Sequence, residues 1–433
     1  MTIPIRCILI LSIFSLAFQN ISAQKDDYYN KEGIKYSNRT YIPNILSLQI
    51  YPESYPLDEA IIQLGSNDKL QISFDDLDGG IKTYMYTFIH CDALWNPSLI
   101  QAPEYIDGFY DDEIRDYAHS FNTTTTYTHY SYVFPNQYMR PRISGNYLMV
   151  IYMDDINAPV ATARFMVSES LVRIDKLKVK RSGTASLMRT HQEIDFSIFP
   201  GSFNIPAPGR DLKVMILQNN RWDNAIKTIP PKNIRIDELD FDYDDLNNFE
   251  AGNEFRNFDI KSLRYNSEFV AAIRFDEHFD VYLKPSFVKT FKPYYSEQDI
   301  NGKRLIKTED MDRSDIEADY AMVHFILPME YPFAMGSLYV FGALTYWDFL
   351  PEARMNYNYD KHQYECNLFL KQGYYNYCYA IAEPGKNAAS LSVTEGNHFE
   401  TENAYSILVY YRQPGQLYDR LIAVSNTSSI VGN

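Results

Sequence analysis

The chain has 433 residues, of which 45% are hydrophobic and 15% aromatic, and its formal net charge is −16. This acidic balance argues against binding to nucleic acid or to an anionic lipid surface, because phosphate groups would be repelled. The length is sufficient for two to four domains.

Residues 1–23 have the pattern of an export signal. Arg6 supplies a positive charge, an apolar run follows over residues 8–18, and Ala23 offers a small residue for cleavage. The apolar run is too short to cross a membrane and is followed at once by Lys25 and two aspartates. We therefore expect a signal peptide and an exported mature chain that does not insert into the membrane.

The mature chain is predicted to be all-β. Apolar and polar residues alternate with a period of two in short segments that Gly, Pro, Asn or Asp interrupts, and no long helical periodicity is present. The clearest strands are expected at residues 147–152, 160–167, 211–217, 337–344 and 406–412. Short strands at regular spacing predict tandem immunoglobulin-like, early-set β-sandwich domains.

Changes in charge and pattern suggest where the domains begin and end. We expect a first sandwich, a second sandwich region with an acidic looped insertion at 237–245, a linker or exposed loop, a third early-set-like sandwich and a flexible tail. In that order, the expected ranges are 24–169, 170–292, 293–319, 320–424 and 425–433.

Three cysteines lie beyond the signal segment, and two of them are candidates for a disulfide. Cys366 and Cys378 flank a predicted hairpin around Gly373. A three-residue loop would place the two directly opposite each other, whereas a loop one residue shorter would place them on opposite faces. Cys91 is most simply a buried strand residue.

The possible metal ligands do not form a convincing site. His90, Cys91 and Asp92 are adjacent in a strand and point alternately to opposite faces, so a buried or edge histidine is the better interpretation. His119 and His129 have no acidic partners at ligand spacing. We predict no metal, no cofactor and no catalytic residues.

The most enzyme-like segment is residues 395–403, which holds three glutamates around His398. Such a cluster could serve a glycosidase or a metal site. A solvated loop, in which Asn and Thr side chains satisfy backbone groups, is the better interpretation.

Two further segments could recognise a partner. Residues 253–262 alternate charges with aromatic rings, and this pattern fits either a recognition surface, with Arg256 and Lys261 as donors, or an edge strand kept soluble by charge. Trp347 and the tyrosines near Gly373 resemble the glycogen-binding type of early-set sandwich, in which such rings bind sugar or form the core.

Ordered motifs resemble one family. The segments beginning at Ile81 (IKTYMYTFIHCDALWNPS) and Ile143 (ISGNYLMVIY), with RFMVSE ending at Glu169, resemble the first domain of the type IX secretion system plug protein of Bacteroidetes. Residues 252–265, 370–377 and 394–405 resemble later parts of the same family. Four consecutive threonines at 123–126 and the long acidic insertion depart from its pattern.

The resemblance implies a non-enzymatic, periplasmic protein at the inner face of the outer membrane. It implies a partner, the outer-membrane type IX translocon barrel (SprA/Sov-like), whose periplasmic opening the protein closes. Arg256, Lys261 and Arg264 are the candidate contact residues. The alternatives are an exported carbohydrate-binding β-sandwich protein, which would expose Trp347 in a groove, and a cargo of the same system, for which the C-terminal segment lacks the expected basic and apolar residues.

Overall fold

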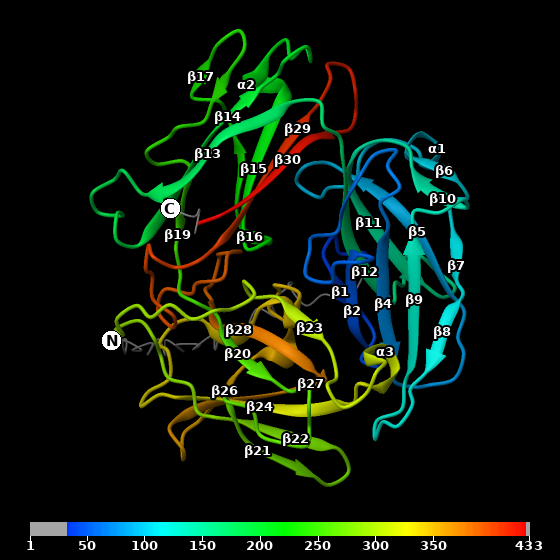
Figure 1. The fold of residues 1–433 in the computed structure, drawn as a ribbon, viewed down its shortest axis with the longest axis vertical. Helices are drawn as coiled ribbons and strands as arrows, with labels where there is room; N and C mark the ends of the chain where they lie inside the picture. Colours follow the sequence, from blue (N-terminus) through cyan, green and yellow to red (C-terminus); the bar gives the residue numbers. More distant parts are fainter. Residues whose placement is uncertain (1–32, 430–433) are drawn as a thin grey trace, which may run out of the picture. The chain divides into compact units, whose positions relative to one another are not determined.

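Strands form nearly all the regular structure of this computed structural model, which describes residues 33–429 (Figure 1). The helices are single turns: α1 (Ala102–Tyr105), α2 (Pro208–Asp211), α3 (Ser314–Glu317) and the 3-10 turns η2 (Ala343–Thr345) and η3 (Pro351–Ala353). Within the described range, none of them has the length and apolar character needed to span a membrane. The predicted all-β class is confirmed, whereas the predicted signal peptide lies outside the described residues.

The first sandwich encloses an aromatic core. One sheet runs in the order β2 (Ile45–Pro52), β4 (Leu70–Asp76), β9 (Thr128–Phe134), β8 (Asp116–His119). The other sheet contains β12 (Ala161–Ser168), β11 (Gly145–Tyr152), β5 (Tyr84–Cys91) and β7 (Asp112–Ile114). Two short strands, β1 (Arg39–Thr40) and β3 (Ile61–Gln63), also pair with β12. A separate two-stranded ribbon consists of β6 (Ile106–Gly108) and β10 (Met139–Pro141). The Phe165 ring lies 5.1 Å from Phe88 and 5.2 Å from Tyr147 in the core.

The second sandwich combines the middle of the chain with its last strands. Its sheets contain β13 (Arg173–Arg181), β14 (His191–Phe199), β18 (Leu239–Asp240), β17 (Asn233–Ile234) and β19 (Asn248–Glu250) on one side, and β16 (Arg221–Ile229), β15 (Leu212–Gln218), β29 (Ala404–Tyr411) and β30 (Arg420–Ser428) on the other. Figure 1 shows the red strands β29 and β30 beside the green β15. Apolar residues of both chain segments fill one core.

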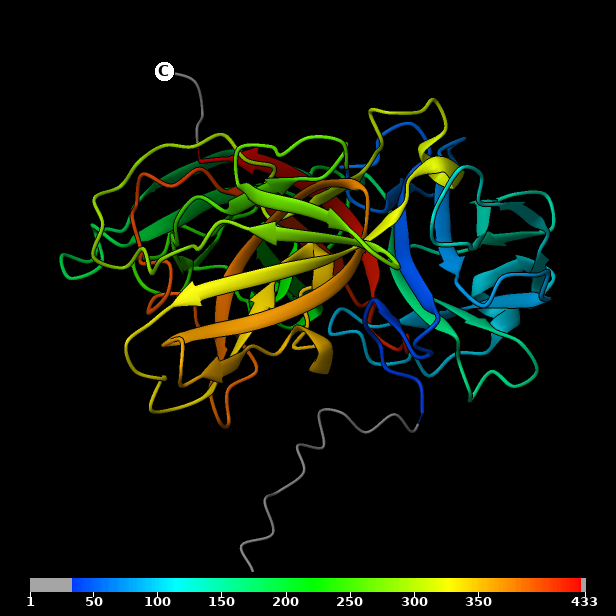
Figure 2. The same ribbon diagram turned by 90° about the horizontal axis from the view of Figure 1, so that it is seen from below.

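The third sandwich is built from residues between these two parts. One sheet contains β20 (Arg256–Asp259), β28 (Gly373–Ala382), β23 (Arg304–Ile306) and β25 (Ser337–Phe341). The other runs in the order β21 (Val270–Phe275), β22 (Phe279–Leu283), β24 (Tyr320–Pro328), β27 (Gln363–Lys371), β26 (Asn356–Asn358). Strands β24 and β27 pair along nine residues, and they run side by side as the long yellow and orange strands of Figure 2.

The first and second sandwiches share a ten-stranded sheet, in which β12 meets β30 at the single pair Ser168–Leu421. The faces of this sheet that point away from the two sandwich cores are also buried, against each other. In this contact Arg164 lies over the ring of Trp95 at 4.3 Å, and the Trp95 and Trp222 rings meet edge to face at 5.3 Å. Strands such as β11 are therefore buried on both sides.

Strand pairing divides the chain differently from the expected boundaries. Strand β29 pairs with β15, and β30 pairs with β29, instead of ending a third sandwich. Strand β30 extends through four of the residues expected as a tail. The expected linker 293–319 contains β23, which pairs with β28. Following the cores, we propose domains of residues 33–169, 170–251 with 397–429, and 252–396.

The candidate disulfide is not formed, because both cysteines carry free, buried thiols. Cys366 lies on β27 and Cys378 on β28, but these strands belong to different sheets and do not pair. Between them the chain crosses from one sheet to the other at Gln372 instead of closing a hairpin. The predicted hairpin was therefore wrong.

Candidate functional site

Arg256, a predicted contact residue, is buried and serves the core. Its Nε donates to Glu395 Oε1 at 3.0 Å, and its Nη2 lies 3.0 Å from Glu395 Oε2. It also donates to Ser286 and to the Phe287 carbonyl, and its guanidinium lies over the Tyr379 ring. With 6% of its surface exposed, Arg256 is not available to a partner, and its assignment as a contact residue was wrong.

The other two predicted contact residues lie nearer the surface. The Lys261 ammonium is 2.6 Å from Glu309 and 3.2 Å from Asp259, so it is already paired. Arg264 is the most accessible, since 69% of its side chain is exposed and its contact with Asp310 is 3.5 Å long. Arg264 is therefore the predicted residue best placed to meet another molecule.

The enzyme-like segment does not gather its acidic groups around His398. Glu395 is occupied by Arg256 and by the Tyr379 backbone N–H, which donates at 2.8 Å. Glu402 accepts from Asn301 at 2.8 Å and from Ser428, whereas Glu400 is exposed. The segment ties the second and third sandwiches together.

A buried group of carboxylates lies beside this segment without an ion pair among the described residues. Asp299 accepts hydrogen bonds from the backbone N–H groups of Phe255 and Asn301, both at 2.6 Å. Burial raises the pKa of Asp299 to about 7, and the nearby Glu254 and Glu402 add to the effect. Burial also raises the pKa of Glu254, whose exposed fraction is 2%.

The histidines have structural partners. His90 is buried between Ser98 Oγ at 2.8 Å and the Ser144 carbonyl at 3.2 Å, and burial lowers its pKa to about 4. Asp92, two residues further along, accepts hydrogen bonds from the backbone N–H groups of Leu94 and Asn96 in the following turn. His129 contacts Asp75 at 2.6 Å.

Trp347 does not stand in an open aromatic groove. Its ring packs edge to face on Phe255 at 5.8 Å and on Phe341 at 5.5 Å, and it is partly buried against the third core. Tyr375 and Tyr377 of the hairpin-like motif are buried in the same core. These rings therefore form part of the sandwich core, which was the alternative to sugar binding.

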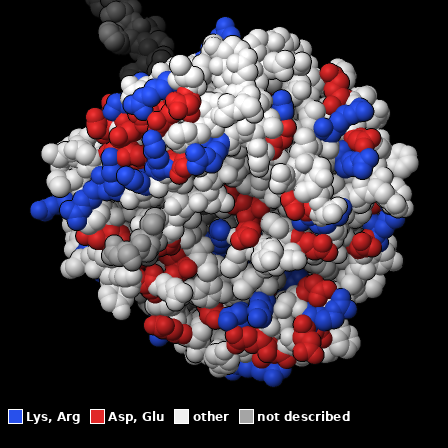
Figure 3. Space-filling view, turned by 45° about the horizontal axis from the view of Figure 1, so that its top comes forward, with Lys and Arg blue, Asp and Glu red and all other residues white. Residues whose placement is uncertain are grey.

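A cavity of about 270 Å³ lies between the second and third sandwiches. Side-chain amides and the buried Arg221 line much of its wall, but Arg221 is already held by Asp223 at 2.7 Å. The surface itself mixes charges: Figure 3 shows basic and acidic side chains interspersed on the face in view.

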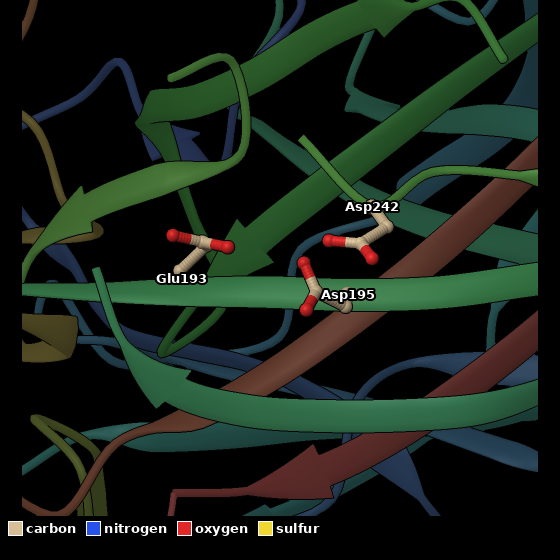
Figure 4. Close-up of side chains that lie close together, drawn as sticks. All are labelled: Glu193, Asp195 and Asp242. Carbon is tan, nitrogen blue, oxygen red and sulfur yellow. The ribbon is translucent and has the colours of Figure 1, made fainter. Parts of the chain in front are cut away.

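Sequence reasoning missed two groups of charged residues. Asp75 and Lys371 form a buried ion pair of 2.6 Å between the first and third sandwiches. Glu193, Asp195 and Asp242 bring their carboxylates together in the second sandwich (Figure 4). The spacing of Glu193 and Asp195, two residues apart on one strand, was a signal that they share a face.

The family model described as type 9 secretion system plug protein 1st domain matches residues 45–169. This range is the first sandwich from the start of β2 to just beyond β12. The chain belongs to the type IX secretion system plug family.

One solved structure supports the rest of the fold. A hypothetical protein from Parabacteroides merdae ATCC 43184 is 35% identical in sequence, with a TM-score of 0.88. The similarity covers 91% of this chain and 100% of that one. No curated protein matched the chain. The resemblance to the plug family, made from ordered motifs, is thus confirmed, and a role in type IX secretion follows from it.

Proposed function

We propose that this plug-family protein is periplasmic, lies at the inner face of the outer membrane, and binds and closes the periplasmic opening of the type IX translocon barrel. The observation that carries the proposal is the family match over residues 45–169, which spans the first sandwich from β2 to β12. A barrel partner of the SprA/Sov-like kind, the signal peptide and the Bacteroidetes source belong to the same proposal.

The contacts between sandwiches suit a body that blocks an opening. The first and second share a sheet and an apolar contact, and the first and third share a buried ion pair. Such contacts resist relative motion more than the polar, partly wet interfaces typical of mobile domains. A plug needs this resistance and no turnover, so we propose a non-enzymatic role.

Arg264 and, to a lesser degree, Lys261 remain our proposed contact residues. Rim charges of this kind change association rate and salt dependence more than they change the strength of a fully buried contact. A partner that must be released during transport fits such an interface. The carbohydrate-binding alternative is not favoured, because Trp347 packs on Phe255 and Phe341.

The proposal is tested by co-purification and by permeability. A tagged mature chain is expected to bring down the translocon barrel from solubilised outer membranes, and deletion of the gene is expected to admit large antibiotics. An Arg264→Glu variant should retain less barrel than an Asp360→Arg control, which also changes an exposed charge. Unchanged permeability together with no captured barrel would refute the assignment.

A further inference from the structure

The polar cavity of about 270 Å³ between the second and third sandwiches has a wall to which both contribute. Strands β15, β16 and β19 supply one side, and the segments that follow β19 and β28 supply the other. Glu250 and Lys386 line it with exposed side chains, so the cavity opens to solvent. Small-molecule pockets usually measure about 300–1,000 Å³, so this one suits a ligand smaller than a typical drug.

Arg221 is held firmly in this wall, with 4% of its surface exposed. Asp223 accepts hydrogen bonds from Arg221 Nε at 3.1 Å and from Nη2 at 2.7 Å, and it also accepts from the Ala389 backbone N–H at 2.9 Å. The ring centres of Phe341 and Trp347 lie 5.5 and 5.6 Å from the guanidinium carbon. These contacts fix the orientation of the guanidinium group.

Asp223 occupies only one edge of that guanidinium. An arginine side chain has about five N–H donors in a planar fork, and Asp223 accepts from Nε and Nη2 alone. Arg221 Nη1 makes no hydrogen bond with any residue in the range 33–429. Guanidinium groups bind carboxylates through pairs of parallel N–H donors. The edge formed by Nη1 and Nη2 is therefore free to hold a second carboxylate, in a cavity that a solute can enter.

Two amide groups of the wall supply hydrogen-bond acceptors. The Oδ1 atoms of Asn224 and Asn248 are buried and accept no hydrogen bond from the described residues. Their nitrogens are engaged, since Asn224 Nδ2 donates to Gln218 at 3.0 Å and Asn248 Nδ2 donates to the Asp244 carbonyl at 2.8 Å. Buried polar atoms normally have a hydrogen-bond partner. The wall thus lacks a donor for these oxygens as well as an acceptor for Arg221.

The charges around the cavity decide what kind of molecule can supply both groups. Arg221 is paired with Asp223, and Lys386 is paired with Glu383 at 2.6 Å. Glu250 also lines the cavity and adds a negative charge. A ligand that carries only negative charge would be opposed by Asp223 and Glu250. A molecule that combines a carboxylate with an amino or amide N–H group matches the free donors and the free acceptors together.

We propose that this cavity binds an α-amino acid or the C-terminal residue of a short peptide. The carboxylate of the ligand accepts hydrogen bonds from the free edge of Arg221. Its amino or amide N–H donates to the Oδ1 atoms of Asn224 and Asn248, and Glu250 attracts a protonated amino group. Because residues of both sandwiches line the cavity, a bound ligand contacts both and stabilises their junction.

Isothermal titration calorimetry of the mature chain at pH 7 tests the proposal, with L-alanyl-L-alanine as the probe. We expect one site with a Kd of about 10⁻⁴–10⁻³ M, because so small a ligand makes few contacts. The same dipeptide with an amidated C-terminus should bind at least about tenfold more weakly, because hydrogen bonds to a charged group are lost. Tetra-alanine separates the two sources of this chemistry. If it binds as tightly as the dipeptide, the ligand is a peptide C-terminus, and if only alanine and the dipeptide bind, it is a free small molecule.

Two tryptophan variants show whether the binding occurs in the cavity. Ala388→Trp leaves Arg221 in place and fills the cavity from its half-buried rim, so it should weaken binding at least about tenfold. Asn387→Trp adds the same ring at the preceding, exposed residue, which does not line the cavity, and should leave the Kd within about twofold. The proposal would be overturned by no saturable binding of the dipeptide to the unmodified chain, by equal Kd values for its free and amidated forms, or by equal effects of the two variants.

Discussion

Replacing Lys371 by methionine should strongly destabilise the contact between the first and third sandwiches. Asp75 and Lys371 are almost fully enclosed, with exposed side-chain fractions of 0% and 2%, and their charged atoms are 2.6 Å apart. Asp75 also accepts from the Tyr320 hydroxyl at 2.7 Å and contacts His129 at 2.6 Å. The substitution leaves the Asp75 carboxylate buried without its main counter-ion.

Removal of one partner of a buried ion pair costs about 3–5 kcal/mol. Because His129 and Tyr320 still contact Asp75, we expect Lys371→Met to lie near the lower value, about 3 kcal/mol. The double variant Asp75→Asn with Lys371→Met should recover part of this loss, since no uncompensated charge remains. The surface pair of Lys386 with Glu383, whose lysine side chain is 64% exposed, provides the control, and Lys386→Met should leave the free energy of unfolding nearly unchanged because solvent screens the pair.

The assay is guanidinium denaturation followed by tryptophan fluorescence and circular dichroism, with both transitions compared because several domains can unfold separately. Burial opposes the charge on Asp75, but Lys371 and His129 outweigh it and hold the pKa of Asp75 below its ordinary value. The stability from this group is therefore present above about pH 4 and lost as pH falls further. Equal losses for Lys371→Met and Lys386→Met would refute the reasoning.

Three other predictions test separate features of the structure. Arg256→Met should lower unfolding stability by about 3–5 kcal/mol, whereas Arg264→Met should change it by less than about 0.5 kcal/mol; similar melting temperatures for the two would contradict the burial of Arg256. The raised pKa of Asp299 keeps its proton bound in the folded state at pH values where the unfolded chain has lost it. The free energy of unfolding should therefore fall as the pH rises from about 4 to about 7, by at most about 1.4 kcal/mol per pH unit. Asp299→Asn should flatten that slope in denaturation series at several pH values. Gly302→Ala should cost about 1–3 kcal/mol in calorimetry, since φ is +74° and the new Cβ would lie 2.2 Å from the Trp347 ring; an unchanged melting temperature would show that the ring moves freely.

The local pattern predicted most strands well because side-chain alternation is a local property. The expected strands at 147–152 and 211–217 correspond to β11 (Gly145–Tyr152) and β15 (Leu212–Gln218). Both contain nearly continuous apolar runs, which occur where both faces of a sheet are buried. That signal could have indicated the contact between the backs of the two sandwiches, but it does not say which strands meet there.

The partners of distant residues could not be read from the sequence. Strand β29 pairs with β15 across almost 200 positions of the chain, and the same local pattern would suit a strand of the third sandwich. Arg256 sits among alternating charges and rings, a pattern that a surface strand and a buried ion pair produce equally well. Its partner Glu395 is far along the chain, so only the folded structure distinguishes the two.

The position of β29 and β30 has a consequence for the order in which the protein matures. A chain that is synthesised from its first residue onward presents the strands of the first sandwich early, and the core of the second stays open until its last strands are made. During that interval the apolar residues of β15 remain uncovered and available to chaperones, proteases or aggregation. A nonsense mutation after residue 403 would therefore remove few residues yet abolish an entire domain, and the fragment should be degraded while its first and third cores are intact.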